Sequence, residues 1–200
     1  MSPLRKLRFS VAAATVALVV LSGCAATPNS SEGQGGQAGS ASEVLTDNGL
    51  AGLAGQELVD KLDATALADR PTTIFASVRN TEVLITDAAG TESSVELPAD
   101  KFYVSIAPFE TFSHECYFHS LTTCTGELTN TEIDVVITDQ ATGEVLVGET
   151  ITTFDNGFIG FWLPRDIKVT VEFTRGDKSA TAVLGTGPED PTCVTTIQLT

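Results

Sequence analysis

Residues 114–124, with the sequence HECYFHSLTTC, contain both histidines of the chain and two of its four cysteines. Thiolates are the preferred protein ligands of Cu(I) and Zn(II), and imidazole binds copper, zinc and iron. A set that mixes sulfur and nitrogen donors disfavours magnesium and calcium, which prefer oxygen. The segment therefore predicts a site for a thiophilic metal, with His114, Cys116, His119 and Cys124 as candidate ligands.

The spacing within this segment matches no common zinc motif. It contains no Cys-x-x-Cys pair, which argues against a zinc ribbon and against a thioredoxin-like motif, and two cysteines do not precede two histidines as in a zinc finger. The spacing is typical of a folded loop rather than a helix. An isolated histidine is more often structural than a ligand, but two histidines beside two cysteines favour ligation.

Cys24 closes a segment that is typical of a secretory signal. Residues 1–23 begin with three basic residues and continue with an apolar run, which is the pattern of a cleaved signal peptide. The end of this run, Leu21-Ser22-Gly23-Cys24, resembles a bacterial lipobox, whose cysteine is lipidated and becomes the first residue of the mature protein. We therefore expect a lipid anchor on Cys24 at the extracytoplasmic face of the bacterial cell membrane. Cleavage to an unanchored secreted protein is the alternative.

Three cysteines remain after this processing, namely Cys116, Cys124 and Cys193. Cysteines of exported proteins normally pair, so an odd number indicates a ligand, a reactive thiol or an intermolecular bond. One alternative is a single disulfide that joins Cys193 to Cys116 or to Cys124 and leaves a buried free thiol. The count therefore adds Cys193 to the candidate metal ligands without deciding between these readings.

The mature chain would be strongly acidic, since all 26 acidic residues lie beyond residue 23 while only eight of the 11 basic residues do, which gives a net charge of −18. Such a surface repels nucleic acid and anionic lipid head groups and attracts cations. The charge excludes nucleic-acid binding. It is compatible with a metal ligand but does not by itself indicate one.

The remaining chain divides by pattern into a tether and two folded parts. Residues 24–42 are rich in Gly, Ser, Ala, Gln and Asn and predict a flexible tether, because they cannot bury enough apolar surface to fold. Residues 43–98 predict a small α+β lobe, with two short helices up to Arg70-Pro71 and strands at 73–78, 82–86 and 94–97. No polar constellation in this lobe indicates catalysis.

Residues 99–200 are rich in short β-type segments separated by turn sequences, which predicts an antiparallel β-sandwich. The fold class is therefore α+β, a small N-terminal helical and β lobe followed by the sandwich. Loops collect at the two ends of a sandwich, so Cys193 and the segment 114–124 can meet there. The predicted strands are 102–107, 132–138, 144–152, 158–163, 168–173, 180–184 and 194–199.

Several strings of the chain closely resemble the CueP family of copper-binding proteins of the bacterial cell envelope. The resemblance extends over about residues 44–199 and includes all three cysteines and both histidines. The strings are LPADKFYVSIAP at 97–108, HECYFHSLTTCTGE at 114–127, NGF at 156–158, FWLPRD at 161–166 and DPTCVTT at 190–196.

This resemblance implies a protein that binds copper outside the cytoplasm and contributes to copper resistance. It implies that His114, Cys116, His119, Cys124 and Cys193 hold copper, and it associates the protein with reduction of Cu(II) to Cu(I) by the thiols. A thiol donor or a copper-acceptor protein would then be a partner. The alternative is a disulfide-stapled β-sandwich lipoprotein that binds a protein or a carbohydrate without metal. Phe161 and Trp162 could shield the site, but a place in the core is the favoured interpretation.

Overall fold

The computed structural model describes residues 36–200, which belong to one compact unit. The predicted signal peptide at 1–23 and the predicted lipidation site Cys24 lie outside the described residues. Helix α1 (Gly36–Asp47) begins within the residues predicted as a tether, and the extent of the tether stays a prediction. Ala41 and Leu45, four residues apart and so on one face of this helix, are both buried.

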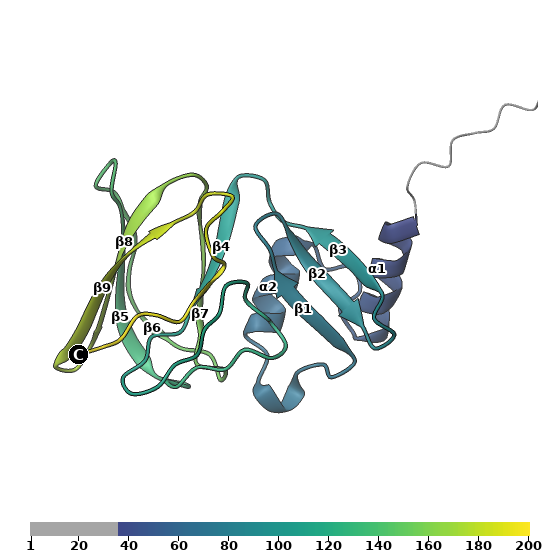
Figure 1. Ribbon diagram of the computed structural model, residues 1–200, viewed down its shortest axis with the longest axis horizontal. Helices are drawn as coiled ribbons and strands as arrows, with labels where there is room; N and C mark the ends of the chain where they lie inside the picture. Colours follow the sequence, from purple (N-terminus) through teal and green to yellow (C-terminus); the bar gives the residue numbers. More distant parts are fainter. Residues whose placement is uncertain (1–35) are drawn as a thin grey trace, which may run out of the picture. The chain divides into compact units, whose positions relative to one another are not determined.

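The N-terminal lobe has the elements predicted from its sequence pattern. Two short helices precede a three-stranded antiparallel sheet with the order β1-β2-β3. Helix α1 contacts β3 and helix α2 contacts β2, so both helices pack against this sheet (Figure 1). The elements after α1 are α2 (Gly55–Asp63), a 3-10 turn η1 (Leu67–Asp69), β1 (Ile74–Val78), β2 (Glu82–Asp87) and β3 (Glu92–Glu96).

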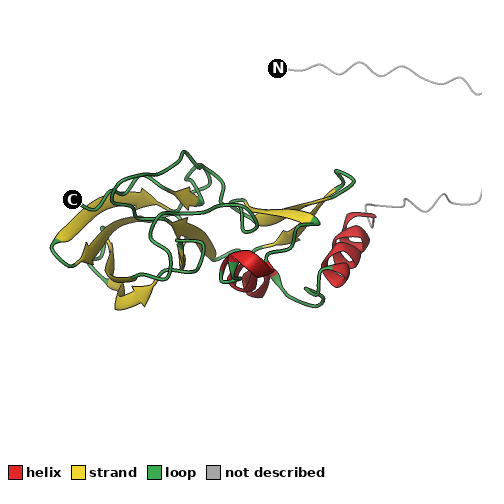
Figure 2. Cartoon of the chain, turned by 90° about the horizontal axis from the view of Figure 1, so that it is seen from below, coloured by secondary structure: helices red, strands yellow, loops and turns green. Residues whose placement is uncertain are grey.

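The predicted sandwich is confirmed, with seven strands in two sheets that form two layers (Figure 2). One sheet has the order β10-β4-β7 and the other the order β6-β5-β8-β9. The strands are β4 (Lys101–Ile106), β5 (Glu132–Asp139), β6 (Val145–Thr152), β7 (Ile159–Pro164), β8 (Lys168–Arg175), β9 (Lys178–Gly185) and β10 (Cys193–Val194).

The last strand differs from its prediction in length and direction. Strand β10 has two residues and runs parallel to β4, so the sandwich is not wholly antiparallel. The apolar residues Ile197 and Leu199, which suggested a strand up to 199, are buried in the sandwich core without extending the ladder of β10. Gln198 between them forms an isolated parallel bridge with Phe109, so the predicted strand is interrupted rather than continuous up to residue 199.

The sandwich core follows from alternation along the strands. In β5 the side chains of Ile133, Val135 and Ile137 are almost fully buried, because every second residue of a strand points to the same face. They pack against Phe161 of β7 and Phe173 of β8 in one apolar cluster. The core makes the sandwich a rigid base for the loops at its ends.

The two parts of the chain share a second apolar cluster. Tyr103 of β4 and Leu121 pack with the buried residues of α2 and β1. The backbone around Leu121 also pairs with β1, since Val78 N donates to His119 O at 2.8 Å and Leu121 N donates to Ala76 O at 2.8 Å. The middle of the long connection between β4 and β5 therefore forms a short extra edge to the N-terminal sheet, and this fixes the position of His119.

A close backbone contact fixes the other end of this connection. Gly126 N donates to Asn156 O at 2.6 Å, and Gly157 has a φ of 79° in the turn before β7. A Cβ atom on Gly157 would lie 2.6 Å from Gly126 O, which is closer than packed atoms allow. Both the positive φ and this contact require glycine at position 157.

Gly157→Ala is expected to lower the free energy of unfolding by about 2–3 kcal/mol, because it adds a steric clash to the strain of a positive φ. Gly143→Ala is the matched control, since Gly143 has a φ of 74° and no atom within 4 Å of the added Cβ. Urea denaturation of the two variants measures the difference. Equal losses of stability would contradict the proposed clash.

Candidate metal centre

The three cysteine sulfurs meet at one place in the fold. Cys116 and Cys193 form a disulfide across 77 residues of sequence, and the free Cys124 has its Sγ 3.7 Å from that of Cys116. The prediction that Cys193 lies beside the cysteines of 114–124 is thus confirmed. The pairing also agrees with the alternative of one disulfide and one buried thiol.

Both histidines lie beside the sulfurs. The donor atoms of His114, Cys116 and Cys124 are all within 4.8 Å of one another, and so are those of His119, Cys124 and Cys193. Cys124 belongs to both groups. The structure therefore brings together all five residues that the sequence singled out, with His114 exposed to solvent and His119 buried.

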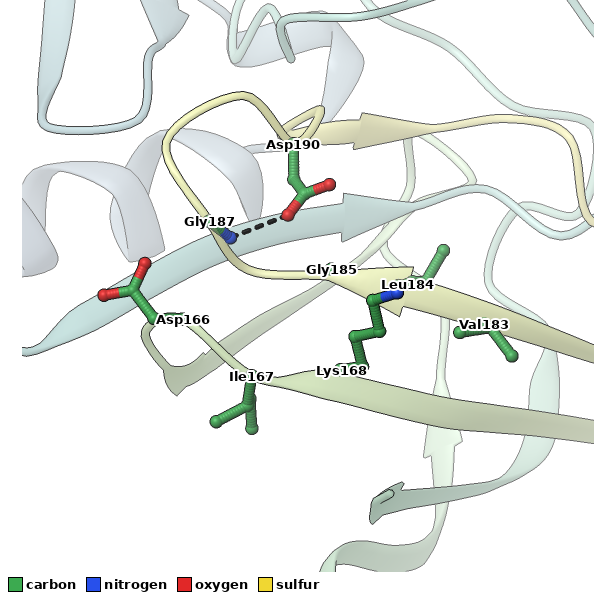
Figure 3. Close-up of a pocket in the computed structure, with 8 residues that line it drawn as sticks. All are labelled: Asp166, Ile167, Lys168, Val183, Leu184, Gly185, Gly187 and Asp190. Carbon is green, nitrogen blue, oxygen red and sulfur yellow. Dashed lines mark hydrogen bonds between the residues drawn. The ribbon is translucent and has the colours of Figure 1, made fainter. Parts of the chain in front are cut away.

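Cys193 is positioned by strand pairing and by the turn that precedes it. It pairs with Ser105 of β4, and its backbone N–H donates to Tyr117 O at 3.1 Å. In the preceding turn the Asp190 carboxylate accepts the Gly187 N–H at 2.7 Å (Figure 3). The pocket drawn there is lined by eight residues, none of which is a cysteine or a histidine, so it is separate from the sulfur cluster.

His114 and Cys116 are fixed by contacts with the strand end on the other side of the disulfide. The Thr195 hydroxyl donates to His114 O at 2.5 Å, and the Ser113 hydroxyl donates to Thr195 O. A surface pocket of about 430 Å³, lined in part by His114, Cys116 and Thr195, opens beside the disulfide. The sulfur cluster can therefore be approached from solvent on this side.

Cys124 closes a tight turn that begins at Ser120. Its backbone N–H donates to Ser120 O at 3.1 Å, and Ser120 N donates to its sulfur at 3.3 Å. Burial alone would raise the pKa of the Cys124 thiol, but the adjacent His119 imidazole outweighs burial and lowers it. A lowered thiol pKa increases the fraction of thiolate, which is the form that binds metal.

A buried cation lies next to this turn. Arg70, which is 9% exposed, donates from Nη1 to Cys124 O at 2.8 Å, while its Nε and Nη2 atoms are buried and have no hydrogen-bond partner among the described residues. Burial lowers the pKa of Arg70, and attraction by Asp63, Cys124 and Asp155 opposes the change. The guanidinium therefore adds positive charge beside the sulfur cluster.

His119 is held by a carboxylate of the N-terminal lobe. Its Nε2 lies 2.8 Å from Oδ1 of Asp63, and both side chains are fully buried. Burial alone would lower the pKa of His119, but the charge and hydrogen bond of Asp63 raise it to about 9. For Asp63, burial alone would raise the pKa, and the charge of His119 together with several hydrogen bonds lowers it. The two residues therefore form a buried ion pair.

The second ring nitrogen of His119, Nδ1, is free. It is buried and has no hydrogen-bond partner among residues 36–200. The ring packs against Phe158, with 4.6 Å between centroids, and Phe158 is fully buried in the cluster that also contains Cys124 and Cys193. Because Nε2 is occupied by Asp63, Nδ1 is the nitrogen left to face the sulfurs.

Three residues of this site were missed by sequence reasoning, namely Asp63, Arg70 and Phe158. A signal for Asp63 existed, since it lies four residues after the buried Val59 and so on the buried side of α2. Phe158 rather than Trp162 is the aromatic residue of the cluster. Phe161 lies in the sandwich core, as favoured, and Trp162 donates to Asp60 at 2.7 Å.

None of the helices in residues 36–200 has the length and apolar character that crossing a membrane would require.

Comparison with known proteins places this geometry in a family. The model of the family described as periplasmic copper-binding protein CueP matches residues 57–198. A solved structure, described as "Crystal Structure of S.CueP", is 37% identical with a TM-score of 0.75, and the match covers 80% of this chain and 98% of that one. No curated protein matches the chain. The chain therefore belongs to the CueP family of periplasmic copper-binding proteins.

Proposed function

We propose that this protein binds copper through His114, Cys116, His119, Cys124 and Cys193, and that its thiols reduce Cu(II) to Cu(I). The single observation that supports this most is the free Cys124 thiol beside the unpartnered Nδ1 of His119. Sulfur and imidazole donors that converge without another partner suit Cu(I). Family membership supports copper as the ion.

The two overlapping donor groups suggest that copper enters at one group and is retained at the other. His114 and Cys116 lie on the side with the surface pocket, whereas His119 and Cys193 are buried. Cys124 belongs to both groups. In our proposal copper is first bound at the exposed group and is then held by the buried one, where water is excluded.

The disulfide provides a balanced route for reduction. Two Cu(II) ions each take one electron from the reduced Cys116 and Cys193 thiols, which yields two Cu(I) ions, one disulfide and two protons. The ions react in succession. Cys116 and Cys193 bind copper only while they are reduced, and Cys124 with His114 and His119 holds the Cu(I) that remains bound once the disulfide has formed. An external dithiol donor must then reduce the disulfide to reset the protein. The Cys116–Cys193 bond corresponds to the oxidised state of this cycle.

The alternative of a metal-free disulfide staple is supported by the same bond but leaves other features without a reason. A staple needs Cys116 and Cys193 only. It does not require a third sulfur at 3.7 Å or a buried imidazole nitrogen without a partner, and unpaired buried polar atoms are costly and rare. Copper binding accounts for all three features.

We also propose that the protein is anchored to the extracytoplasmic face of the membrane through a lipid on Cys24. Support comes from the sequence pattern alone, an apolar run that ends in Leu21-Ser22-Gly23-Cys24. Residues between this anchor and α1 would connect the copper site to the membrane surface. In this position the protein would contribute to copper resistance by capturing copper outside the cytoplasm.

Anaerobic addition of Cu(II) to the fully reduced protein is expected to produce about two Cu(I) and to consume two of the three thiols, because one disulfide supplies two electrons. A Cu(I)-specific chelator and a thiol titration measure both quantities. The variant with Cys116, Cys124 and Cys193 all replaced by Ser is the control and should give neither. If wild-type protein forms no Cu(I) and loses no thiol, reduction is excluded, and chelator competition still tests binding.

Copper affinity is expected to rise with pH between 7 and 9. Since the pKa of His119 is raised to about 9, Nδ1 is protonated at pH 7, and Cu(I) must displace this proton. The competition weakens as the pH approaches 9, so the loss of this proton raises the copper affinity by up to about tenfold per pH unit. Chelator competition should show that the slope of log affinity against pH is smaller by about one in His119→Ala, where only the thiol protons remain. Equal slopes would show that His119 releases no proton.

Cys24→Ala is expected to move the protein from the membrane fraction to the supernatant of lysed cells, because the lipid attachment site is lost. Mass spectrometry of the wild-type N-terminal peptide should show an acylated Cys24. An unmodified Cys24, or a variant that still sediments with membranes, would refute the anchor and leave the copper proposal unaffected.

A further inference from the structure

Asp63 is the last residue of α2, and it is fully buried at the junction between the N-terminal lobe and the sandwich. Four side chains surround its carboxylate. Oδ1 lies 2.8 Å from His119 Nε2 and 2.8 Å from Asn156 Nδ2, while Oδ2 lies 2.5 Å from the Tyr103 hydroxyl and 2.9 Å from the Ser105 hydroxyl. Both oxygens are thus fully paired.

These partners come from separate parts of the chain. Tyr103 and Ser105 belong to β4, Asn156 to the turn before β7, and His119 to the connection that pairs with β1. A carboxylate with all its lone pairs engaged cannot rotate without breaking several buried hydrogen bonds, each of which is costly to leave unmade. Asp63 is therefore a fixed point against which the His119 ring is set.

The direction of the His119 ring has a chemical consequence. An ionised carboxylate only accepts hydrogen bonds, so Nε2 must carry its hydrogen and donate it to Asp63. In the neutral ring the lone pair then resides on Nδ1, the nitrogen that has no partner and lies in the group with Cys124 and Cys193. Metal-binding histidines commonly donate their second N–H to a carboxylate in this way.

We propose that Asp63 is a positioning residue for copper binding, because it fixes the tautomer and orientation of His119 so that the Nδ1 lone pair faces the sulfurs of Cys124 and Cys193. This inference rests on the proposed copper function. The inference also distinguishes the roles of the two histidines. The ring of the exposed His114 has no hydrogen-bond partner in the described part of the chain, so no neighbouring group fixes its tautomer. The N-terminal lobe thereby contributes to a site whose five donor atoms all lie outside it.

The first experiment needs no variant. The ring nitrogens of the full-length reduced protein are followed by 15N NMR before and after anaerobic addition of Cu(I), which is diamagnetic. We expect the Nδ1 signal of His119 to shift strongly while Nε2 remains protonated. Binding of Cu(I) through Nε2, or an unchanged His119 signal in a copper-loaded protein, would overturn the inference. Failure of the wild-type protein to take up Cu(I) would instead overturn the proposed function.

The second experiment compares Asp63→Asn with two controls. Asp60→Asn changes the same helix, where Asp60 contacts Trp162 and not His119. Tyr103→Phe removes another hydrogen bond of Asp63 but leaves the His119 contact. Asp63→Asn should weaken Cu(I) affinity about 10- to 100-fold and alter the His119 NMR signals. Asp60→Asn should stay within about threefold of wild type, and Tyr103→Phe, which keeps the contact between Asp63 and His119, should lose less affinity than Asp63→Asn.

A purely structural role for Asp63 predicts a different pattern. Copper affinity would then fall with thermal stability in Asp63→Asn and Tyr103→Phe alike, and the His119 signals of folded Asp63→Asn would match those of wild type. Wild-type affinity in folded Asp63→Asn would also contradict the positioning role. If Asp63→Asn does not fold, the wild-type NMR measurement still decides.

Discussion

The ion pair between Asp63 and His119 is the interaction on which the arrangement of the site depends. An isolated charge in the interior costs several kcal/mol, and it persists only with a partner and further hydrogen bonds. Asp63 has His119 as its partner and three additional donors, which connect α2, β4 and the turn before β7. The site therefore exists only when the lobe and the sandwich are docked. This explains why Tyr103 and Leu121 belong to a cluster shared by both parts.

A second constraint concerns the sulfurs, which in the proposed redox cycle must stay close whether reduced or oxidised. A disulfide that closes a loop of 77 residues lowers the entropy of the unfolded chain and stabilises the fold by roughly 4.5 kcal/mol in the loop-entropy model, so reduction removes considerable stability. The hydrogen bonds that hold β10 do not involve the sulfur atoms, so opening the disulfide breaks none of them. β10 is paired with β4, and the Thr192 hydroxyl donates to Val78 O at 2.7 Å and accepts a hydrogen bond from His119 N at 3.0 Å. These contacts keep Cys193 near Cys116, which a reversible cycle requires.

The sequence predicted the candidate metal ligands better than the residues that hold these ligands in position. Cysteine and histidine are rare in this chain, so their clustering at 114–124 and the odd cysteine count pointed directly to the five candidate ligands, and alternation revealed the strands. Helical spacing could place Asp63 on the buried side of α2, but not identify its role, because its partners lie 40 to 93 residues away in the sequence. The direction of β10 was also hidden, since parallel and antiparallel pairing of so short a strand leave the same apolar pattern.

Selectivity must come from the buried donors rather than from the acidic surface. The formal net charge of −15 raises the local concentration of every cation, hard or soft, without discrimination. Within the buried group the candidate donors are sulfur and imidazole, and the buried carboxylate of Asp63 has all its acceptor positions occupied by protein hydrogen bonds. It therefore offers no free oxygen to a hard cation. The same four hydrogen bonds that hold Asp63 thus keep its oxygens from serving as the ligands that calcium and magnesium prefer.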